Sequence, residues 1–354
     1  MKIGLLGLPL SGKTTFFNLL TGAGVTTAAY AEERASHAGV AKVPDTRVDV
    51  LSDLFEPQKT TYARINIVDI PGLGKNGALE YTAPLQDTDA LVLIVRGFVN
   101  EAMGMADSPH PVTDLEDVLT ELIISDLSLV ERRLERLAKN SKAANILPSE
   151  PEALLKAREA LENEQPVSSQ EYSVEEKLAL RNYGLYTEKP MLAVLNTSEE
   201  GLSSNNALGQ AELTAYTREH HLPLLMVCAP LEEEISQLPA DERLVFLEDL
   251  GVSESGVARL ARAAYAHLDL ISYFTVGSDE VRAWTIHRGT RARQAAGKIH
   301  SDIERGFIRA EVVSYEDMVR EKTVAKLREK GLLRLEGKDY VVQDGDIISF
   351  RFNV

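Results

Sequence analysis

A short loop near the N-terminus has the residue types and spacing of a phosphate-binding site. Gly7, Gly12, Lys13 and Thr14 follow the apolar run KIGLL and precede the helix-like run FFNLL. Glycines lack a Cβ, so the backbone N–H groups can turn toward phosphate oxygens, and a helix start adds partial positive charge. Lys13 is expected to reach the β- and γ-phosphates, and Thr14 to hold Mg²⁺. The spacing predicts a P-loop made of Gly7, Leu8, Pro9, Leu10, Ser11, Gly12, Lys13, Thr14 and Thr15.

A carboxylate closes the second strand-like run, INIV. The residues that follow it are Asp69, Ile70, Pro71 and Gly72. Open α/β sheets bind ligands at the carboxyl ends of their strands. We therefore expect Asp69 to hold Mg²⁺ through water and the Gly72 N–H to meet the γ-phosphate. Thr14 and Asp69 are the predicted metal residues.

Two later strand ends carry residues suited to recognising a nucleotide base. Asn196 and Glu199 follow the run MLAV, in the place where GTPases carry Asn-Lys-x-Asp, and Cys228-Ala229 follows the next strand. A Glu199 carboxylate can accept hydrogen bonds from guanine or from the adenine amino group. The residues alone therefore leave ATP and GTP open. Base-recognition elements favour a nucleotide switch over a small-molecule phosphotransferase, which needs an acceptor pocket.

The elements that position these residues form an alternating pattern. Near-continuous apolar runs at 2–8, 65–72, 91–98, 191–196 and 222–230 alternate with helical patterns. Such runs are typical of a mostly parallel sheet that helices cover on both faces. The sequence predicts an α/β P-loop NTPase domain, a G-domain.

Two segments have sequence patterns that differ from this alternation. An apolar seam at spacings of four and three (Ile123, Leu127, Val130, Leu134 and Leu137), followed by PEALLKAREALENE, predicts an inserted helical hairpin. After about residue 270 short strands lead to Asp344-Gly345, a hairpin turn signal between two β-rich runs. The predicted domains are 1–113 with 186–270 for nucleotide, 114–185 for the helical insertion, and 272–354 for a β-rich domain.

Composition limits the class of protein. The chain of 354 residues has 44% hydrophobic and 26% charged residues, and it lacks an apolar run near the roughly 18 residues that a membrane span needs. The net charge is −16, yet residues 272–354 carry 15 Lys and Arg against 13 Asp and Glu, so the acidity lies before them. The first strand begins at Lys2 without a signal-peptide pattern, and Cys228 is the single cysteine. We expect a cytoplasmic protein without a membrane partner.

The sequence resembles the YchF (Obg-like) ATPases of the translation-factor GTPase class over nearly its whole length. The strongest match is IHSDIERGFIRAEVVSYEDM with EGKDYVVQDGDIISFRFNV, which is similar to the family's terminal TGS-type β-grasp domain. The stretch ELIISDLSLVERRLERL and the strand end VRGF also match. The resemblance implies a G-domain with a helical insertion and a TGS domain. It also implies a preference for ATP, because the family has Glu, here Glu199, in place of the guanine-reading Asp, and lacks a Lys at the position of Thr197.

The resemblance implies association with ribosomes as well. A cationic face for ribosomal RNA is expected from Arg288, Arg291, Arg293 and Lys298, with His287 and His300 beside them. A solvated, salt-paired surface is the alternative for these residues.

The chain departs from the family in its switch regions. The family has a threonine-containing segment before the Pro-Asp of its first switch, whereas here no threonine lies between Tyr30 and Pro44. Thr26 or Thr27 is left to substitute as the residue that senses the γ-phosphate. Leu73 stands where many GTPases have a glutamine that orients the attacking water. The family also has an apolar residue at this position. The family supplies a histidine from a loop after the strand equivalent to LVLIVRGF, where this chain has Gly104. His110, six residues later, is the candidate catalytic residue.

Together these features predict an ATP-preferring P-loop NTPase that uses Mg²⁺ and couples slow hydrolysis of ATP or GTP to contact with ribosomes. A nucleotide-binding sensor or scaffold that barely hydrolyses is the first alternative, favoured by the altered switches. A small-molecule phosphotransferase is the second.

Overall fold

A computed structural model describes residues 1–23, 37–70, 83–101, 105, 107–139, 147–249 and 254–353. Contacts divide the chain into two compact units. The first contains residues 1–41 and 66–256, and the second contains residues 42–65 and 257–354. Each unit is built on a six-stranded sheet.

The sheet of the first unit has the strand order β2-β4-β1-β5-β6-β7. These strands are β2 (His37–Lys42), β4 (Arg64–Asp69), β1 (Lys2–Leu6), β5 (Ala90–Gly97), β6 (Met191–Thr197) and β7 (Leu224–Val227). β1 pairs in parallel with β4 and β5, and β6 pairs in parallel with β5 and β7. The five predicted runs and the mostly parallel sheet are therefore confirmed. β2 was missed, because the run HAGVAK mixes small and polar residues at a sheet edge.

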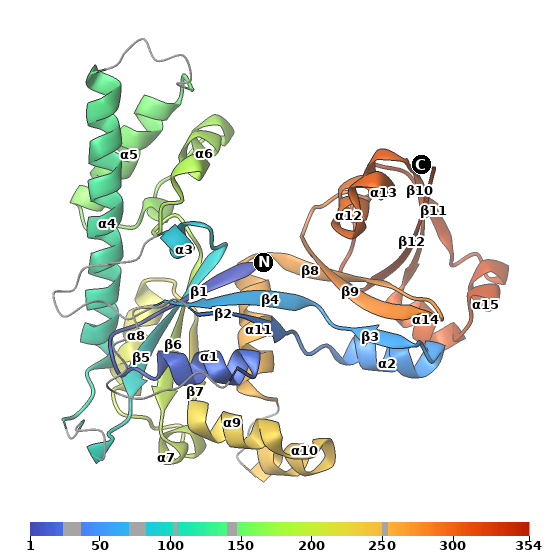
Figure 1. The fold of residues 1–354 in the computed structure, drawn as a ribbon, viewed down its shortest axis with the longest axis horizontal. Coiled ribbons are helices and arrows are strands. Elements are labelled where there is room, and N and C mark those ends of the chain that lie inside the picture. The colour runs from blue at the N-terminus through green and yellow to red at the C-terminus, as the bar shows by residue number, and fades with distance from the viewer. Residues whose placement is uncertain are drawn as a thin grey trace. The chain divides into compact units, whose positions relative to one another are not determined.

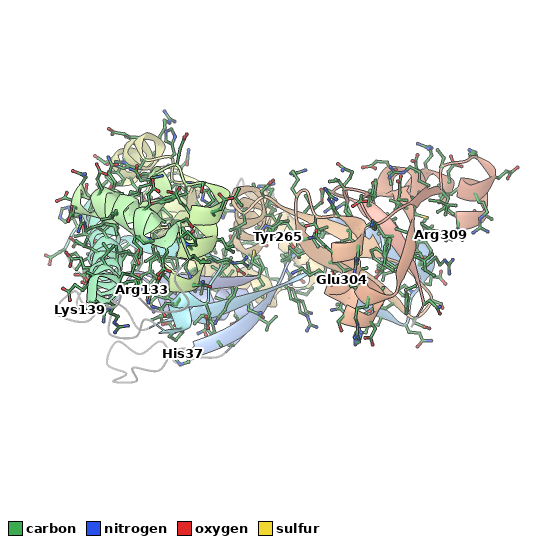
Figure 2. The ribbon with its side chains drawn as sticks, turned by 90° about the horizontal axis from the view of Figure 1, so that it is seen from above. His37, Arg133, Lys139, Tyr265, Glu304 and Arg309 are labelled. Atoms are coloured by element: carbon green, nitrogen blue, oxygen red, sulfur yellow. The ribbon has the colours of Figure 1, made fainter. Side chains whose placement is uncertain are left out.

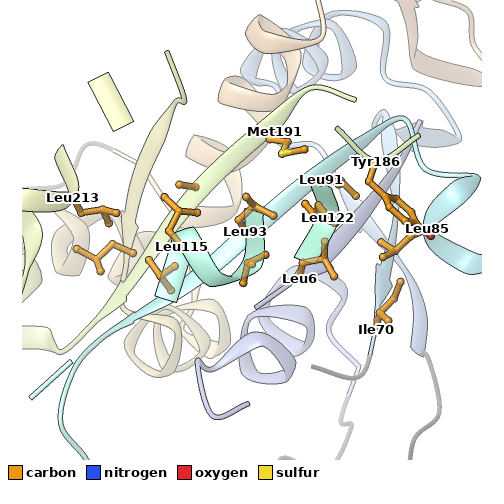
Figure 3. Packing of buried hydrophobic residues seen from close by; sticks show 14 of the residues in the cluster. Leu6, Ile70, Leu85, Leu91, Leu93, Leu115, Leu122, Tyr186, Met191 and Leu213 are labelled. Atoms are coloured by element: carbon orange, nitrogen blue, oxygen red, sulfur yellow. The ribbon is translucent and has the colours of Figure 1, made fainter. Parts of the chain in front are cut away.

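The first unit also contains helices, some packed on the sheet and others in the inserted hairpin (Figure 1). They are α1 (Lys13–Thr21), α3 (Ala83–Gln86), α4 (Pro111–Lys139), α5 (Glu150–Glu162), α6 (Val174–Leu180), α7 (Glu199–Ser203), α8 (Gln210–Glu219), α9 (Ala229–Gln237) and α10 (Ala240–Asp249), with 3-10 turns at Val167–Ser169 and Arg181–Tyr183. One core cluster lies between the sheet and α4, where Leu115 and Leu122 pack against Leu91, Leu93 and the other strand residues drawn in Figure 3. Removing this apolar surface from water is the main stabilising contribution of the core.

The inserted hairpin is formed by α4 and α5, which lie side by side (Figure 1). Val130 is buried, and the other four seam residues pack against a cluster that includes Ala153, Leu154 and Ala157 of α5. The apolar seam thus serves packing within the hairpin. α4 already begins at Pro111, and its first turns belong to the core of the sheet, so no break separates the hairpin from the first unit at residue 114.

Asp126 interrupts the apolar side of α4 and has a structural role. Its carboxylate is 1% exposed and accepts hydrogen bonds from the backbone N–H groups of Tyr186 and Thr187, at 2.9 and 2.7 Å, and from the Thr187 hydroxyl. Burial raises the pKa of Asp126, and these donors oppose that shift. The contacts fix α4 to the segment that leads into β6.

The sheet of the second unit has the order β11-β10-β12-β8-β9-β3. The strands are β3 (Lys59–Thr61), β8 (Leu270–Thr275), β9 (Glu280–His287), β10 (Phe307–Ser314), β11 (Arg334–Glu336) and β12 (Asp346–Phe352). The helices are α2 (Thr46–Phe55), α11 (Gly256–His267, in this unit from Val257), α12 (Ala292–Ile299), α13 (Ser301–Arg305), α14 (Tyr315–Glu321) and α15 (Val324–Glu329). The antiparallel pair β8–β9, the helix α12 against the sheet, and β12 parallel to β8 form the predicted β-grasp arrangement.

The second unit differs from the prediction in its extent and in one turn. Residues 257–270, assigned to the nucleotide domain, belong to this unit. Residues 42–65, assigned to the nucleotide domain, lie in this unit because β3 pairs in parallel with β9 and Arg47 of α2 forms an ion pair with Asp344 at 2.9 Å. The predicted hairpin at Asp344-Gly345 is wrong. β12 is flanked by β10 and β8, so Val341 pairs with Arg291 in an isolated bridge instead.

Candidate functional site

The predicted P-loop connects the end of β1 to the start of α1. Gly12 precedes α1 in a left-handed conformation with φ +86°, which favours glycine, and a Cβ there would lie 2.1 Å from Nδ2 of Asn196. A Cβ on Gly7 would lie 2.4 Å from the carbonyl oxygen of Ile94. Both glycines are therefore required by close approach of the neighbouring strands β5 and β6. Leu10 also has a left-handed conformation, with φ +66°.

The other P-loop residues differ in exposure. Pro9 and Leu10 are exposed, whereas Leu8 and Thr15 are half-buried. The Leu8 carbonyl accepts a hydrogen bond from the Ser11 N–H at 3.2 Å, which closes the loop into a turn. Ser11 itself is 2% exposed.

Lys13, Thr14 and Asp69 meet at the carboxyl edge of the sheet. Lys13 Nζ donates to Asp69 Oδ1 at 2.6 Å, and Thr14 Oγ1 donates to Asp69 Oδ2 at 3.1 Å. The parallel register places Leu5 of β1 opposite Asp69 of β4, so the loop after β1 and the end of β4 share one edge. Lys13 is 8% exposed and Asp69 2%, which makes this a buried ion pair. The oxygen donors suit Mg²⁺, which proteins bind through one or two carboxylates together with phosphates.

Asn196 joins two of the predicted loops. Its Nδ2 donates to the Ser11 carbonyl at 3.1 Å, and its Oδ1 accepts from the Ala229 N–H at 3.1 Å. Ala229 is the first residue of α9, directly after Cys228, whose thiol pKa is raised by burial. One buried amide thus connects the phosphate loop to the predicted base loop.

Thr197 and Glu199, which stand in place of the Lys and Asp of the GTPase motif Asn-Lys-x-Asp, lie in different environments. Thr197 is 2% exposed, and its hydroxyl donates to the Gly97 carbonyl at 3.3 Å. A Cβ on Gly201 would lie 2.4 Å from that hydroxyl, so this side is closely packed. Glu199 begins α7 and is exposed. Of these two residues, Glu199 is therefore the one available to a base.

His110 is not brought into this cluster. It is exposed, lies directly before α4, and its carbonyl accepts the Asp114 N–H at 2.9 Å. Between described residues, no hydrogen bond or ion pair connects His110 with Lys13, Thr14 or Asp69. Its catalytic role stays a prediction. Gly72, Leu73, Gly104, Thr26 and Thr27 lie outside the described residues.

A histidine outside the predicted site residues lies beside the cluster instead. Nδ1 of His37, the first residue of β2, is 3.8 Å from Asp69 Oδ2 (Figure 2 labels His37). The histidine lies more than thirty positions before Asp69 in the sequence. Only pairing in the sheet brings the two together, and recognising HAGVAK as an edge strand was the one signal available.

The predicted cationic face is partly neutralised. Arg288 pairs with Asp269 at 2.9 Å, Arg291 pairs with Asp339 at 2.6 Å, and Nε of Arg293 donates to the Glu304 carbonyl at 3.2 Å. Lys298 is exposed, as are His287 and His300. Exposed ion pairs contribute little to stability, so Arg288 and Arg291 can exchange partners at low cost.

The loop and its sheet define a P-loop NTPase of the G-domain class. A family model described as "50S ribosome-binding GTPase" matches residues 2–131, and the C-terminal YchF GTPase model, described as a protein of unknown function, matches residues 270–353. The ribosome-binding ATPase YchF of Bacillus subtilis is 39% identical, and that of Pasteurella multocida is also 39% identical, covering 100% of this chain and 100% and 99% of those proteins. The chain belongs to the YchF family.

A solved structure supports the fold. The YchF GTPase of Schizosaccharomyces pombe superposes with a TM-score of 0.85 at 29% sequence identity, and the match covers 99% of this chain and 97% of that one. In the part of the chain that the structure describes, no helix is long and apolar enough to cross a membrane.

Proposed function

We propose that this protein binds ATP with Mg²⁺, hydrolyses it slowly, and uses the nucleotide state to control its binding to ribosomes in the cytoplasm. The observation that carries the proposal is the convergence of Lys13 and Thr14 on Asp69 at the carboxyl edge of a parallel sheet. The names of its relatives, ribosome-binding ATPases, support the choice of nucleotide and partner.

Each residue has a defined task in this proposal. Lys13 exchanges Asp69 for the β- and γ-phosphates, whose negative charge it neutralises. Thr14 turns its hydroxyl oxygen to the metal, and Asp69 holds the metal through water. Bound Mg²⁺ would supply charge neutralisation at the transferred phosphoryl group. Asn196 keeps the phosphate loop and the Ala229 loop at a constant separation.

The proposal is tested with purified protein. ATP and GTP binding are measured by calorimetry, and turnover is measured with and without ribosomes. We expect tighter ATP binding and slow turnover that changes when ribosomes are added. Binding without turnover under both conditions would favour the sensor alternative, whereas phosphoryl transfer to a small molecule in place of water would favour the phosphotransferase.

Base choice gives a second prediction. Glu199→Asp shortens the carboxylate by one methylene, so it weakens a charge-assisted hydrogen bond to adenine and brings the side chain closer to the guanine-reading Asp of GTPases. We expect the preference for ATP over GTP to fall about tenfold, or about 1.4 kcal/mol. Glu200→Asp, an exposed neighbour in α7, is the matched control and should keep the wild-type preference. An equal change in both variants would contradict a role for Glu199.

The packing of Thr197 limits which variants are informative. Converting Thr197 to Lys would recreate the GTPase motif together with Glu199→Asp. It would also place a charged side chain where the hydroxyl is now buried against Gly97 and Gly201. We therefore expect that double variant to be destabilised, and the single Glu199→Asp change is the cleaner test.

His110 gives a prediction about chemistry. We propose that its side chain positions the attacking water once a bound nucleotide or ribosome brings it toward the γ-phosphate. His110→Ala should then lower single-turnover ATP hydrolysis with ribosomes by about 10²-fold or more. His220→Ala, at an exposed histidine that ends α8, should not. Equal rates for wild type and His110→Ala with ribosomes would eliminate His110 as the catalytic residue.

A further inference from the structure

The imidazole of His37 faces the carboxylate that the proposed function assigns to the metal. Nδ1 lies 3.8 Å from Asp69 Oδ2, and Thr14 Oγ1 lies 3.1 Å from the same oxygen. The His37 side chain is 31% exposed, whereas that of Asp69 is 3% exposed. The histidine therefore stands at the solvent side of a buried cluster. A shift of about 1 Å would bring the nitrogen to hydrogen-bond distance of the carboxylate.

The start of β2 is held against the helix that carries Lys13 and Thr14. The His37 and Phe17 rings lie 6.2 Å apart between centroids. Two residues along β2, a Cβ on Gly39 would lie 2.4 Å from Cγ2 of Thr21, so the strand backbone packs directly on α1. These contacts fix the backbone position of His37 relative to the phosphate loop.

Asp69 changes partners in the proposed function. Its Oδ1 accepts from Lys13 and its Oδ2 from Thr14. Both donors turn to phosphate and metal when Mg-nucleotide binds, so metal-bound water takes their place on the buried carboxylate. His37 is a further side chain beside Oδ2 whose ring N–H can also donate to this carboxylate. Residues that hydrogen-bond to a metal-holding carboxylate orient it and tune metal affinity.

We propose that His37 is a positioning residue that orients the Asp69 carboxylate and thereby sets the magnesium requirement of nucleotide binding. This inference rests on the proposed binding of Mg-nucleotide. It assigns His37 no contact with substrate and no proton transfer.

The test measures ATP affinity by calorimetry over a range of free Mg²⁺ concentrations, and in excess chelator. We expect His37→Ala to raise about tenfold the Mg²⁺ concentration that gives half of the maximal increase in ATP affinity. ATP affinity in excess chelator should stay unchanged. His37→Asn, which keeps an N–H donor near the position of Nδ1, should restore most of the wild-type Mg²⁺ dependence. Val40→Ala is the matched control in β2, because Val40 is exposed and should change neither value.

The outcomes separate the inference from the function on which it rests. A wild-type Mg²⁺ dependence in His37→Ala would overturn the positioning role of His37. It would do so even if Lys13→Ala weakens nucleotide binding and thereby supports the proposed function. An equal loss of affinity with and without Mg²⁺ would also overturn it, since that is the effect of damaged packing against Phe17. Absence of Mg²⁺-dependent nucleotide binding in the wild-type protein would instead contradict the proposed function.

Discussion

Lys13→Ala is expected to lower ATP affinity at least tenfold and to lower the free energy of unfolding by about 3–5 kcal/mol. The loss of affinity follows from removing a charge-assisted contact to phosphate, worth about 1.5–3 kcal/mol. The loss of stability follows because Asp69, 2% exposed, would keep a buried charge without its partner at 2.6 Å. Calorimetry measures the first effect, and urea denaturation without nucleotide measures the second.

A double variant separates the two effects. Lys13→Ala with Asp69→Asn leaves no unpaired charge, so most of the lost stability should return while ATP affinity stays low. Lys59→Ala is the surface control. Lys59 pairs with Glu280 at 3.5 Å while 66% of its side chain is exposed, so its removal should cost less than about 1 kcal/mol and leave ATP binding unchanged. Wild-type ATP affinity in Lys13→Ala would refute the P-loop assignment.

Asn196→Ala is expected to lower ATP affinity about tenfold and stability by about 2–3 kcal/mol. The amide is 2% exposed, and its removal leaves the Ser11 carbonyl and the Ala229 N–H without their hydrogen bonds. Each unsatisfied buried group costs about 1–3 kcal/mol. Affinity should fall with stability because the phosphate loop and the loop before α9 lose the side chain that holds them together. Calorimetry and urea denaturation again provide the measurements.

The neighbouring Thr197 provides the control for Asn196. Its hydroxyl is equally buried but donates to the Gly97 carbonyl. Thr197→Val should cost about 1 kcal/mol of stability and leave ATP affinity unchanged. A similar loss of ATP affinity in both variants would show that burial near the end of β6, and not the bridge made by Asn196, is what matters.

The sequence predicted the nucleotide site where its chemistry is local. The P-loop is a contiguous strand, loop and helix, so spacing alone specifies its glycines, Lys13 and Thr14. Asp69 and Asn196 were predicted because each ends an apolar strand, and parallel strands place their carboxyl ends at one edge. The apolar seam of α4 likewise predicted the helical hairpin, because periodic burial is a property of one segment.

Contacts between distant segments were decided by tertiary structure alone. Residues 42–65 lie in the second unit because β3 pairs with β9, more than two hundred residues further along the chain. The expected hairpin at Asp344-Gly345 did not form because β10 and β8 occupy both sides of β12. Sheet pairing places His37 beside Asp69. Close packing places the Thr197 hydroxyl against Gly97 and Gly201. Sequence periodicity reports which face of a segment is buried, whereas the partner buried against it depends on the whole fold.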